Sequence, residues 1–399
     1  MKPVIGMDVA KGKSVAQAFV KRNYPFGRVQ EILHTPKGFE KLKQLLEELE
    51  QKTTHKPAVI LEPTGHYHRI LVFYLQQAGY EVILVNPLQA QRARRTGLRK
   101  VKTDASDAWH LGELYYQEEN WSTYPGRKEA LVDLQFLTRE HEFITSLYVQ
   151  AKLNMRTLVD QIFPSYEGVF KDLYSKTSLN LLEACLTSEG VKAQTPEAWM
   201  GMVKAATQAS RSETWMNRKV EALQNAIADN PVQRVPYGLE MALRSLLALV
   251  REFQKQLTEL EKVILELSQT LNEVQLLESI PGVGTKLATA IVSEIGDASQ
   301  FRHPKQLVAY AGIDPSVFSS GKFVATQNKI TKRGSKRLRR AMYLAVTCGL
   351  RRGINPGLRE YYDRKKSEGK PHKVAVIACA NKLLHHVYAM LKKGQPYTL

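Results

Sequence analysis

Four acidic residues in the N-terminal part of the chain have the type and placement expected of metal ligands. Asp8 lies inside one apolar run, Glu62 closes another, and Asp104 and Asp107 stand three apart at a predicted helix start. An acid within a buried strand is costly unless a cation compensates its charge. Carboxylate oxygens suit Mg²⁺ or Mn²⁺, and two such ions about 3.5–4 Å apart can clamp the attacking and leaving oxygens of a phosphodiester. The four acids therefore predict a divalent-metal site.

Each acid alone also permits a simpler interpretation. Asp104 could cap a helix, and Asp107 could be a favourable charge in its first turn. Glu62 could be a solvated residue at a strand end. Asp8 is the hardest to explain in this way, because apolar residues surround it. Taken together, the four acids favour the metal site.

The elements around these acids predict an α/β domain over residues 1–124. Three strands followed by alternating helix and strand indicate a mixed sheet with helices packed on it. A turn containing Asn23, Pro25 and Gly27 is expected between the second and third strands. The expected strands are 4–9, 14–20, 28–33, 58–62 and 81–85, and the expected helices are 39–49 and 70–77.

Residues 125–275 are predicted to be helical, with an insertion of short helices at about 165–240. Five apolar heptads begin at Leu243 and predict a coiled coil. This helix could join two copies of the chain or could pair within one chain with the helix at 128–162. The two seams are Leu243, Val250, Leu257, Ile264 and Leu271, and Leu246, Phe253, Leu260, Leu267 and Val274.

Residues 276–399 form a third predicted domain, mostly helical, with helices at 337–350 and 374–391. Its Ile280–Gly284 segment resembles a helix-hairpin-helix turn, in which Gly282 and Gly284 would let backbone N–H groups approach a phosphate. The same turn could also be plain architecture, which we consider the weaker of the two interpretations. A loop or hairpin over 318–327 contains Ser319 and Ser320.

The charge of the chain indicates a polyanionic partner. Its 57 Lys and Arg against 39 Asp and Glu give a formal charge of +18, which favours nucleic acid without choosing among kinds. Two acid-free basic runs flank candidate motifs and are better explained by phosphate contacts than by a solvated face. These runs are Arg92, Arg94, Arg95, Arg99, Lys100 and Lys102, and Lys329, Lys332, Arg333, Lys336, Arg337, Arg339 and Arg340.

The cysteine content and the hydropathy of the chain indicate the cellular compartment of the protein. Three distant cysteines argue against a disulfide framework or a thiolate zinc site. No apolar run approaches the length that spans a membrane, and no signal-peptide pattern begins the chain. We expect a cytoplasmic protein with no membrane partner, associated with the nucleoid when active.

Three motifs resemble those of the DEDD transposases, the "one-ten" family of bacterial insertion sequences. They are Ile5–Lys11, Glu62–Tyr67 and Lys102–Ala108. The resemblance implies an N-terminal domain with a ribonuclease-H-like fold similar to that of the RuvC junction resolvase. It also implies that Asp8, Glu62, Asp104 and Asp107 form a metal-binding catalytic tetrad.

The C-terminal pieces resemble the transposase domain of the same family. Tyr310–Pro315, Ser319–Gly321 and Lys332–Ser335 follow one another in the family's order, which implies that Ser320 is the nucleophile. Related members often carry Gln where this chain has Ser319, so the attacking residue could also be Ser319. We favour Ser320.

The resemblance further implies the partners of the reaction. The tetrad of one protomer and the serine of another would form a composite site in a dimer or tetramer, and a bridge RNA would pair with donor and target DNA. We therefore expect a transposase that excises and inserts its element through a phosphoserine intermediate with Mg²⁺ or Mn²⁺. One alternative is a junction endonuclease that uses metal-activated water, and another is a non-catalytic nucleic-acid-binding protein.

Overall fold

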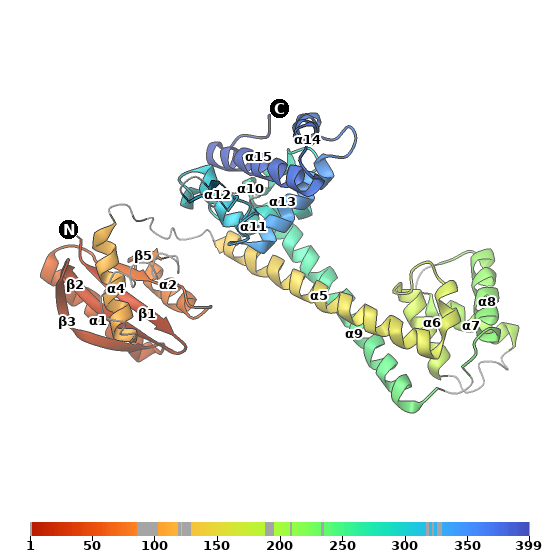
Figure 1. Ribbon diagram of the computed structural model, residues 1–399. Coiled ribbons are helices and arrows are strands. Elements are labelled where there is room, and N and C mark those ends of the chain that lie inside the picture. Colours follow the sequence, from red (N-terminus) through yellow and green to blue (C-terminus); the bar gives the residue numbers. More distant parts are fainter. Residues whose placement is uncertain are drawn as a thin grey trace. The chain divides into compact units, whose positions relative to one another are not determined.

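The chain forms two compact units, residues 1–128 and 129–399 (Figure 1). The computed structural model describes residues 2–85, 103–118, 121, 129–187, 195–207, 210–232, 235–316, 319–320, 323–324 and 329–398. The boundary predicted near residue 275 falls inside the second unit.

A five-stranded mixed sheet forms the centre of the first unit, as predicted. Its order is β3-β2-β1-β4-β5, in which β1 pairs antiparallel with β2 and parallel with β4. The β2–β3 pair is antiparallel and the β4–β5 pair is parallel. The strands are β1 (Val4–Ala10), β2 (Lys13–Lys21), β3 (Tyr24–Leu33), β4 (Ala58–Leu61) and β5 (Glu81–Leu84).

The turn between β2 and β3 is shorter than predicted. Asn23 takes the left-handed conformation, with φ 60°, so Pro25 and Gly27 lie inside β3 instead of in the turn. The β2–β3 register shifts between Ala16 and Ala18, where Gly27 has φ 66°. An edge strand tolerates this because proline's missing N–H faces no neighbouring strand.

Helices cover both faces of this sheet (Figure 1). α1 (Pro36–Thr53) and α2 (His68–Gln77) bury their leucines with the odd-numbered residues of β1. α4 (Asp104–Gln117) packs Leu111 and Leu114 against Val4 and Ile60 on the opposite face. β1 is therefore covered on both sides, which explains its nearly continuous apolar sequence.

Two long helices, α5 (Glu129–Ile162) and α9 (Tyr237–Gln269), pack along each other within the second unit. The heptad helix thus has a partner in its own chain. It is also shorter than predicted, because α9 ends at Gln269 and Leu271 is already the N-cap of a new helix, α10 (Asn272–Glu278). Leu257 and Leu260, in the middle of the seams, remain half-exposed.

One helical cluster connects the end of α5 to the start of α9. It contains η1 (Pro164–Gly168), α6 (Lys176–Thr187), α7 (Pro196–Ala206) and α8 (Glu213–Ala228), which pack around a core that includes Tyr166 and Trp199. Short helices were predicted here. Gly201 lies inside one of them, α7.

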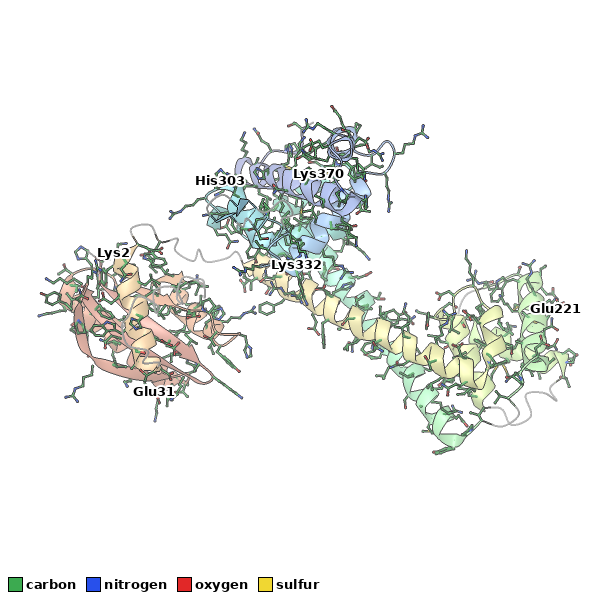
Figure 2. All side chains as sticks on the ribbon, viewed as in Figure 1. Lys2, Glu31, Glu221, His303, Lys332 and Lys370 are labelled. Atoms are coloured by element: carbon green, nitrogen blue, oxygen red, sulfur yellow. The ribbon has the colours of Figure 1, made fainter. Side chains whose placement is uncertain are left out.

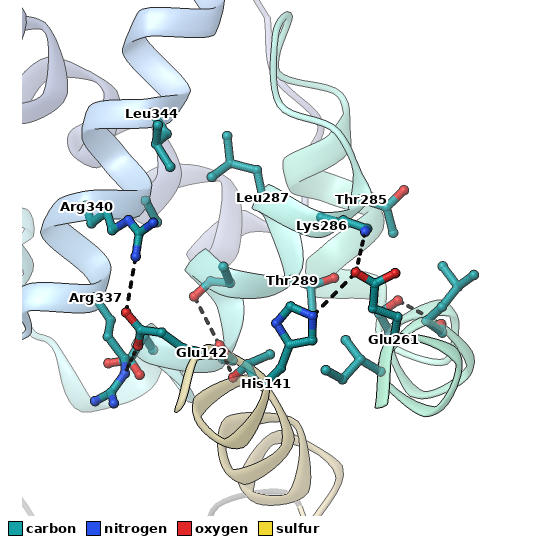
Figure 3. A pocket seen from close by; sticks show the side chains of 18 residues that line it. His141, Glu142, Glu261, Thr285, Lys286, Leu287, Thr289, Arg337, Arg340 and Leu344 are labelled. Carbon is teal, nitrogen blue, oxygen red and sulfur yellow. Dashed lines mark hydrogen bonds and ion pairs between the residues drawn. The ribbon is translucent and has the colours of Figure 1, made fainter. Parts of the chain in front are cut away.

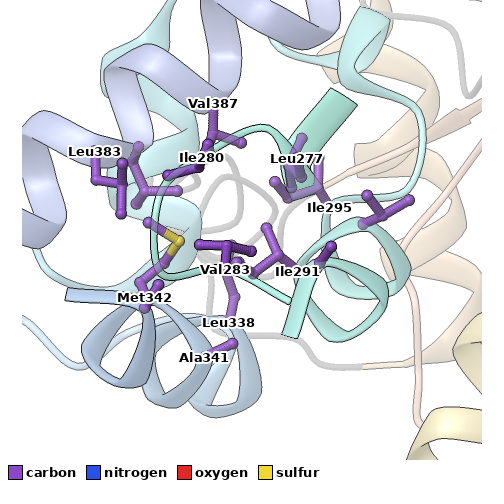
Figure 4. Packing of buried hydrophobic residues seen from close by; sticks show 14 of the residues in the cluster. Leu277, Ile280, Val283, Ile291, Ile295, Leu338, Ala341, Met342, Leu383 and Val387 are labelled. Atoms are coloured by element: carbon purple, nitrogen blue, oxygen red, sulfur yellow. The ribbon is translucent and has the colours of Figure 1, made fainter. Parts of the chain in front are cut away.

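A second helical cluster surrounds the other ends of α5 and α9. Residues of the α10–α11 turn, α13 and α15 meet in its core (Figure 4). The cluster also contains a two-stranded hairpin, β6 (Ser319–Ser320) and β7 (Phe323–Val324). Its helices are α10, α11 (Thr285–Ile295), η3 (Ala298–Gln300), α12 (Pro304–Ala311), α13 (Lys336–Gly349), α14 (Pro356–Ser367) and α15 (His372–Lys393).

Two of these helices add to the sequence interpretation. α14 was not predicted, although Asn355 caps it and Pro356 occupies its first turn, as helix starts commonly show. α15 is long and apolar enough to cross a membrane by composition, which was not expected. Ala380, Leu383 and Val387 bury its apolar face, as a core helix of a globular domain would.

The α10–α11 turn makes a close backbone contact with the end of α13. Gly282 has φ 95°, and a Cβ atom there would lie 2.8 Å from the Gly349 nitrogen at the end of α13. Gly284 precedes α11 and would place a Cβ atom in open space. Packing alone therefore requires glycine at 282, whereas it leaves 284 unconstrained.

Replacing Gly282 by alanine is expected to lower the free energy of unfolding by about 1–3 kcal/mol, because alanine strains a left-handed backbone. The clash with Gly349 adds to that loss. The matched Gly284→Ala change should leave stability within about 0.5 kcal/mol. Urea titrations followed by circular dichroism measure both values, and equal stabilities for the two variants would contradict this account.

Candidate active site

The contact between α4 and β1 brings the predicted acids to one edge of the sheet. A Cβ atom on Gly6 would lie 2.2 Å from the Ala108 carbonyl oxygen and 2.6 Å from the Gly112 nitrogen. A Cβ atom on Gly112 would in turn lie 2.2 Å from the Phe19 ring. The helix backbone therefore rests directly on the sheet, and only glycine permits this distance.

The direction of α4 places its first turn beside the end of β1. The Tyr116 hydroxyl, near the end of α4, donates to the carbonyl of Lys2, which precedes β1, at 3.2 Å. α4 thus runs opposite to β1. The pKa of Lys13, just after β1, is raised mainly by its hydrogen bond to Glu31 and to a smaller extent by the charge of Asp104. Asp104 therefore acts electrostatically at this end of the strand.

Asp8 and Glu62 occupy matching positions on neighbouring parallel strands. Met7 pairs with Leu61, so the next residues, Asp8 and Glu62, follow one another across the β1–β4 pair. Val4 and Gly6 face α4, and side chains alternate along a strand, so Asp8 is directed toward the same helix. All four predicted acids thus belong to elements that meet at one edge of the sheet.

The first turn of α4 has its own cap. Thr103 accepts a hydrogen bond from the Ser106 nitrogen at 3.1 Å, and Ser106 accepts one from the Thr103 nitrogen at 3.0 Å. The proposal that Asp104 caps this helix is therefore wrong, and its side chain is exposed. Asp107 is 6% exposed, which a favourable interaction with the helix dipole does not require.

The donor types at this edge fit a hard divalent cation, because they are carboxylates. In the part of the chain that the structure describes, no three His, Cys, Asp or Glu side chains lie close enough to hold one ion. The backbones that carry the four acids thus meet at one edge of the sheet. Their carboxylate groups, however, do not surround a common point. Four like charges repel, so their closer approach requires a counter-charge.

Ser320 lies at the end of a short hairpin in the second unit. It pairs with Phe323, and Ser319 pairs with Val324. The base of this hairpin is fastened by Thr331, whose hydroxyl donates to Asp314 Oδ1 at 2.6 Å and whose nitrogen donates to the Asp314 carbonyl at 3.0 Å. The side chains of Ser319 and Ser320 are outside the described residues.

The two predicted basic runs have different outcomes. Residues 92–102 lie outside the described part of the chain, so Arg92, Arg94, Arg95, Arg99, Lys100 and Lys102 stay predictions. In the second run, Lys332, Arg333 and Lys336 are exposed at the start of α13. Arg337 and Arg340 pair instead with Glu142 of α5, beside a cavity of about 390 Å³ among α5, α9, α11 and α13 (Figure 3).

The sequence analysis did not identify a buried acid, Glu294, that bonds to Ser335 within the second basic run. Glu294 of α11 is 3% exposed and receives hydrogen bonds from Arg139 at 2.8 and 3.2 Å and from the Ser335 hydroxyl at 2.6 Å. Burial raises the pKa of Glu294, but the bonds from Arg139 and Ser335 outweigh it and lower that pKa overall. Ser335 also caps α13. Nothing in the sequence around Glu294 distinguishes it from a surface glutamate.

Two family models match the chain. The first, described as a transposase of the DEDD type of IS110, spans residues 5–164, and the second, described as the transposase IS116/IS110/IS902 family, spans residues 274–363. The chain belongs to the IS110 family of transposases. The predicted family is thereby confirmed, and the models include the positions of all five candidate catalytic residues.

Known relatives agree with this assignment. A 44.8 kDa protein of insertion element IS116 from Streptomyces clavuligerus is 25% identical over 84% of this chain and 82% of its own length. The pilin gene-inverting protein of Moraxella bovis is 32% identical over 37% of this chain and 47% of its own. The structure of T. thermophilus RuvC with a Holliday junction substrate matches at 11% identity over 31% of this chain and 99% of that chain, with a TM-score of 0.24.

Membership of the IS110 family makes the protein an insertion-sequence transposase, an enzyme that cleaves and rejoins DNA. The tetrad positions lie in the first unit and Ser320 lies in the second. In the first unit, the contact of α4 with β1 positions the tetrad. In the second unit, the bonds between Thr331 and Asp314 lie near the hairpin that carries Ser320.

Replacing Gly6 by alanine should separate α4 from β1, because the new methyl group meets the Ala108 carbonyl. We expect a loss of about 1–3 kcal/mol in stability and loss of DNA cleavage, since Asp104 and Asp107 would move away from Asp8. Thermal unfolding and a plasmid excision assay measure the two effects. Gly201→Ala, which meets nothing within 4 Å, is the control, and full cleavage by Gly6→Ala would refute the proposed role of this contact.

Proposed function

We propose that this IS110-family transposase exchanges DNA strands through a covalent phosphoserine intermediate formed on Ser320. The observation that carries the proposal is the match of the two family models to both candidate regions, 5–164 and 274–363. The convergence of β1, β4 and α4 on one edge supports a common role for Asp8, Glu62, Asp104 and Asp107.

The serine would act as the nucleophile in a transesterification. Its oxygen forms a bond to a backbone phosphorus, and the bond from that phosphorus to one sugar oxygen breaks. The serine proton passes to an ionised carboxylate of the acidic set, and the departing sugar oxygen takes up a proton. A sugar hydroxyl of a second strand then attacks the phosphoserine and releases the serine, so the number of phosphodiester bonds is conserved.

The acidic residues would hold a divalent cation, Mg²⁺ or Mn²⁺. When bound, such a cation supplies Lewis-acid stabilisation of the charge that develops on the phosphate. The chain's own contribution is to position Asp8 and Glu62 on neighbouring strands and Asp104 and Asp107 on one turn of α4. The cap made by Thr103 and Ser106 holds that turn without using an acid.

The acids and the serine would come from different copies of the chain. A hydroxyl on a hairpin in one unit and acids in another unit suit a composite site between protomers. The half-exposed Leu257 and Leu260 on α9 support a homodimer or a larger homo-oligomer, since apolar seam residues gain from further burial.

A bridge RNA would select the donor and target DNA. In this arrangement base pairing carries the sequence specificity, and the protein contacts backbone and shape. The exposed Lys332, Arg333 and Lys336, next to the helix cap made by Ser335, support a phosphate-contacting role for this loop. Gly284 remains a candidate backbone contact, whereas the close packing of Gly282 against α13 gives that glycine a structural role.

Replacing Ser320 by alanine is expected to abolish excision and the covalent protein–DNA adduct, because the nucleophile is removed. The neighbouring Ser319→Ala change should retain at least roughly a third of wild-type adduct formation. Adducts are measured by gel shift after nuclease digestion and located by peptide mass spectrometry. Adduct on Ser319, or full excision by Ser320→Ala, would contradict the assignment, and the second result favours a water-using nuclease.

Metal binding by the acids predicts a stabilising effect of Mn²⁺. Millimolar MnCl₂ should raise the melting temperature of the wild-type protein, because a cation that binds only the folded state stabilises it. Asp8→Asn and Asp104→Asn should lose most of this rise and all cleavage. Glu40→Gln, which removes an exposed acid on α1, should retain both, and an unchanged Mn²⁺ effect in all variants would exclude the acidic site as the cause.

A further inference from the structure

The C-terminal fifty residues have a large excess of positive charge that the candidate active site does not use. Residues 350–399 contain eleven Lys and Arg against three acids, a net charge of +8. Two of those acids are already paired, Asp363 with Arg359 at 2.9 Å and Glu368 with Lys365 at 2.8 Å. Figure 2 shows Lys370 in the turn between α14 and α15. Most of these cations lie on α14 and α15, which pack against each other.

Three of these cations are gathered around one aromatic ring. Arg364, Lys365 and Lys382 lie 5.0, 5.4 and 4.7 Å from the centre of the Tyr361 ring. The first two belong to α14 and the third to α15, so the packing of the two helices brings them together. Interaction with the ring face holds Arg364 and Lys382 in place without compensating their charge, whereas Lys365 is also paired with Glu368. Like charges held together in this way attract an anion.

A hollow of about 520 Å³ opens beside this cluster between α14 and α15. Polar and aromatic side chains dominate its lining, which includes no acid. Burial, and to a smaller extent the charge of Lys382, lowers the pKa of the adjoining His386. The lining residues are Tyr361, Ala378, Asn381, Lys382, His385, His386 and Ala389.

We propose that this α14–α15 groove binds the phosphodiester backbone of a nucleic acid, as a second contact surface apart from the basic runs at 92–102 and 329–340. Converging cations with an amide donor at Asn381 match a chain of phosphates better than a single small anion, because Lys366, Lys370 and Lys373 continue the charge along the same elements. None of these residues belongs to the candidate catalytic set, so the inference does not depend on the phosphoserine mechanism.

The source of the phosphates is either DNA or RNA, and the chemistry of the groove is common to both. A protein partner is less well matched, because the aliphatic side chains in the lining are alanines, Ala378 and Ala389, which offer no deep apolar pocket for a hot-spot side chain. The absence of acids among the lining residues also suits a phosphate backbone, whose oxygens are hydrogen-bond acceptors.

The test compares two charge-matched double variants of the full chain. Arg364→Gln with Lys382→Gln removes two cations from the groove, and Lys392→Gln with Lys393→Gln removes two from the end of the same α15. Fluorescence anisotropy is measured with a 30-base-pair duplex DNA and with a 30-nucleotide RNA, each of random sequence, over a range of salt concentrations. Circular dichroism verifies that both variants are folded.

The groove variant should bind at least one of the two probes roughly tenfold more weakly than the control variant. The dependence of log affinity on log salt should become shallower by about two for DNA, since each lost phosphate contact removes nearly one counterion. A loss restricted to one probe identifies the source as DNA or RNA. Equal affinities and salt slopes for the groove and control variants on both probes would overturn the proposal.

A second measurement on the unaltered protein guards against a folding defect in the variant. Amine-reactive labelling followed by mass spectrometry reports the exposure of each lysine. Bound nucleic acid should lower the labelling of Lys382 at least threefold more than that of Lys392. Equal labelling of both lysines, with and without saturating DNA and RNA, would reject the groove as a binding surface.

Discussion

The approach of α4 to β1 is the contact on which the arrangement of the N-terminal acids depends. Gly6 and Gly112 contribute no side chains at the crossing point, so the helix backbone lies directly on the strand and the Phe19 ring packs against Gly112. Because the helix runs opposite to the strand, the first turn of α4 meets the carboxyl end of β1. Any side chain at this crossing would lift the helix and separate the two halves of the acidic set.

The second unit depends on a different interaction, a buried ion pair. Glu294 joins α5 through Arg139 and the start of α13 through Ser335, in surroundings where an unpaired carboxylate would be costly. The loop that carries Lys332 and Arg333 is therefore held to α5 through Ser335, Glu294 and Arg139. Thr331 and Asp314 extend this fixed region to the base of the Ser320 hairpin. Hydrogen bonds thus connect the buried Glu294 to the basic loop that carries Lys332 and Arg333.

Positive charge in this transposase is distributed over several elements. The Arg337 and Arg340 side chains share Glu142 of α5, so part of the run at 329–340 serves to join α13 to the helix pair. The cations around Tyr361 have less compensation, although they lie outside both runs that sequence reading singled out. Density of basic residues in the sequence is therefore a poor guide to free positive charge on the surface. The pairing of each cation in three dimensions decides which of them can meet a phosphate.

Much of the fold follows from local sequence patterns. Periodicity identified all five strands of the sheet, the long heptad helix and the helices α1, α2, α13 and α15, because hydrophobic spacing reports directly on which face is buried. The three acidic motifs were sufficient to indicate the family. They also predicted the residues of the acidic set, since an acid inside a buried strand is conspicuous in any sequence.

Tertiary structure decided the features that involve partners distant in the chain. Whether α9 pairs within its own chain, whether Gly282 serves packing, and whether Arg337 is available to a ligand all depend on residues more than fifty positions away. Glu294 gains its partner Arg139 from another helix, and Lys382 of α15 joins the two α14 cations around Tyr361 only in the folded chain. A sequence determines local propensity and periodicity, but the compensation of a buried charge is settled by what the folded chain places beside it.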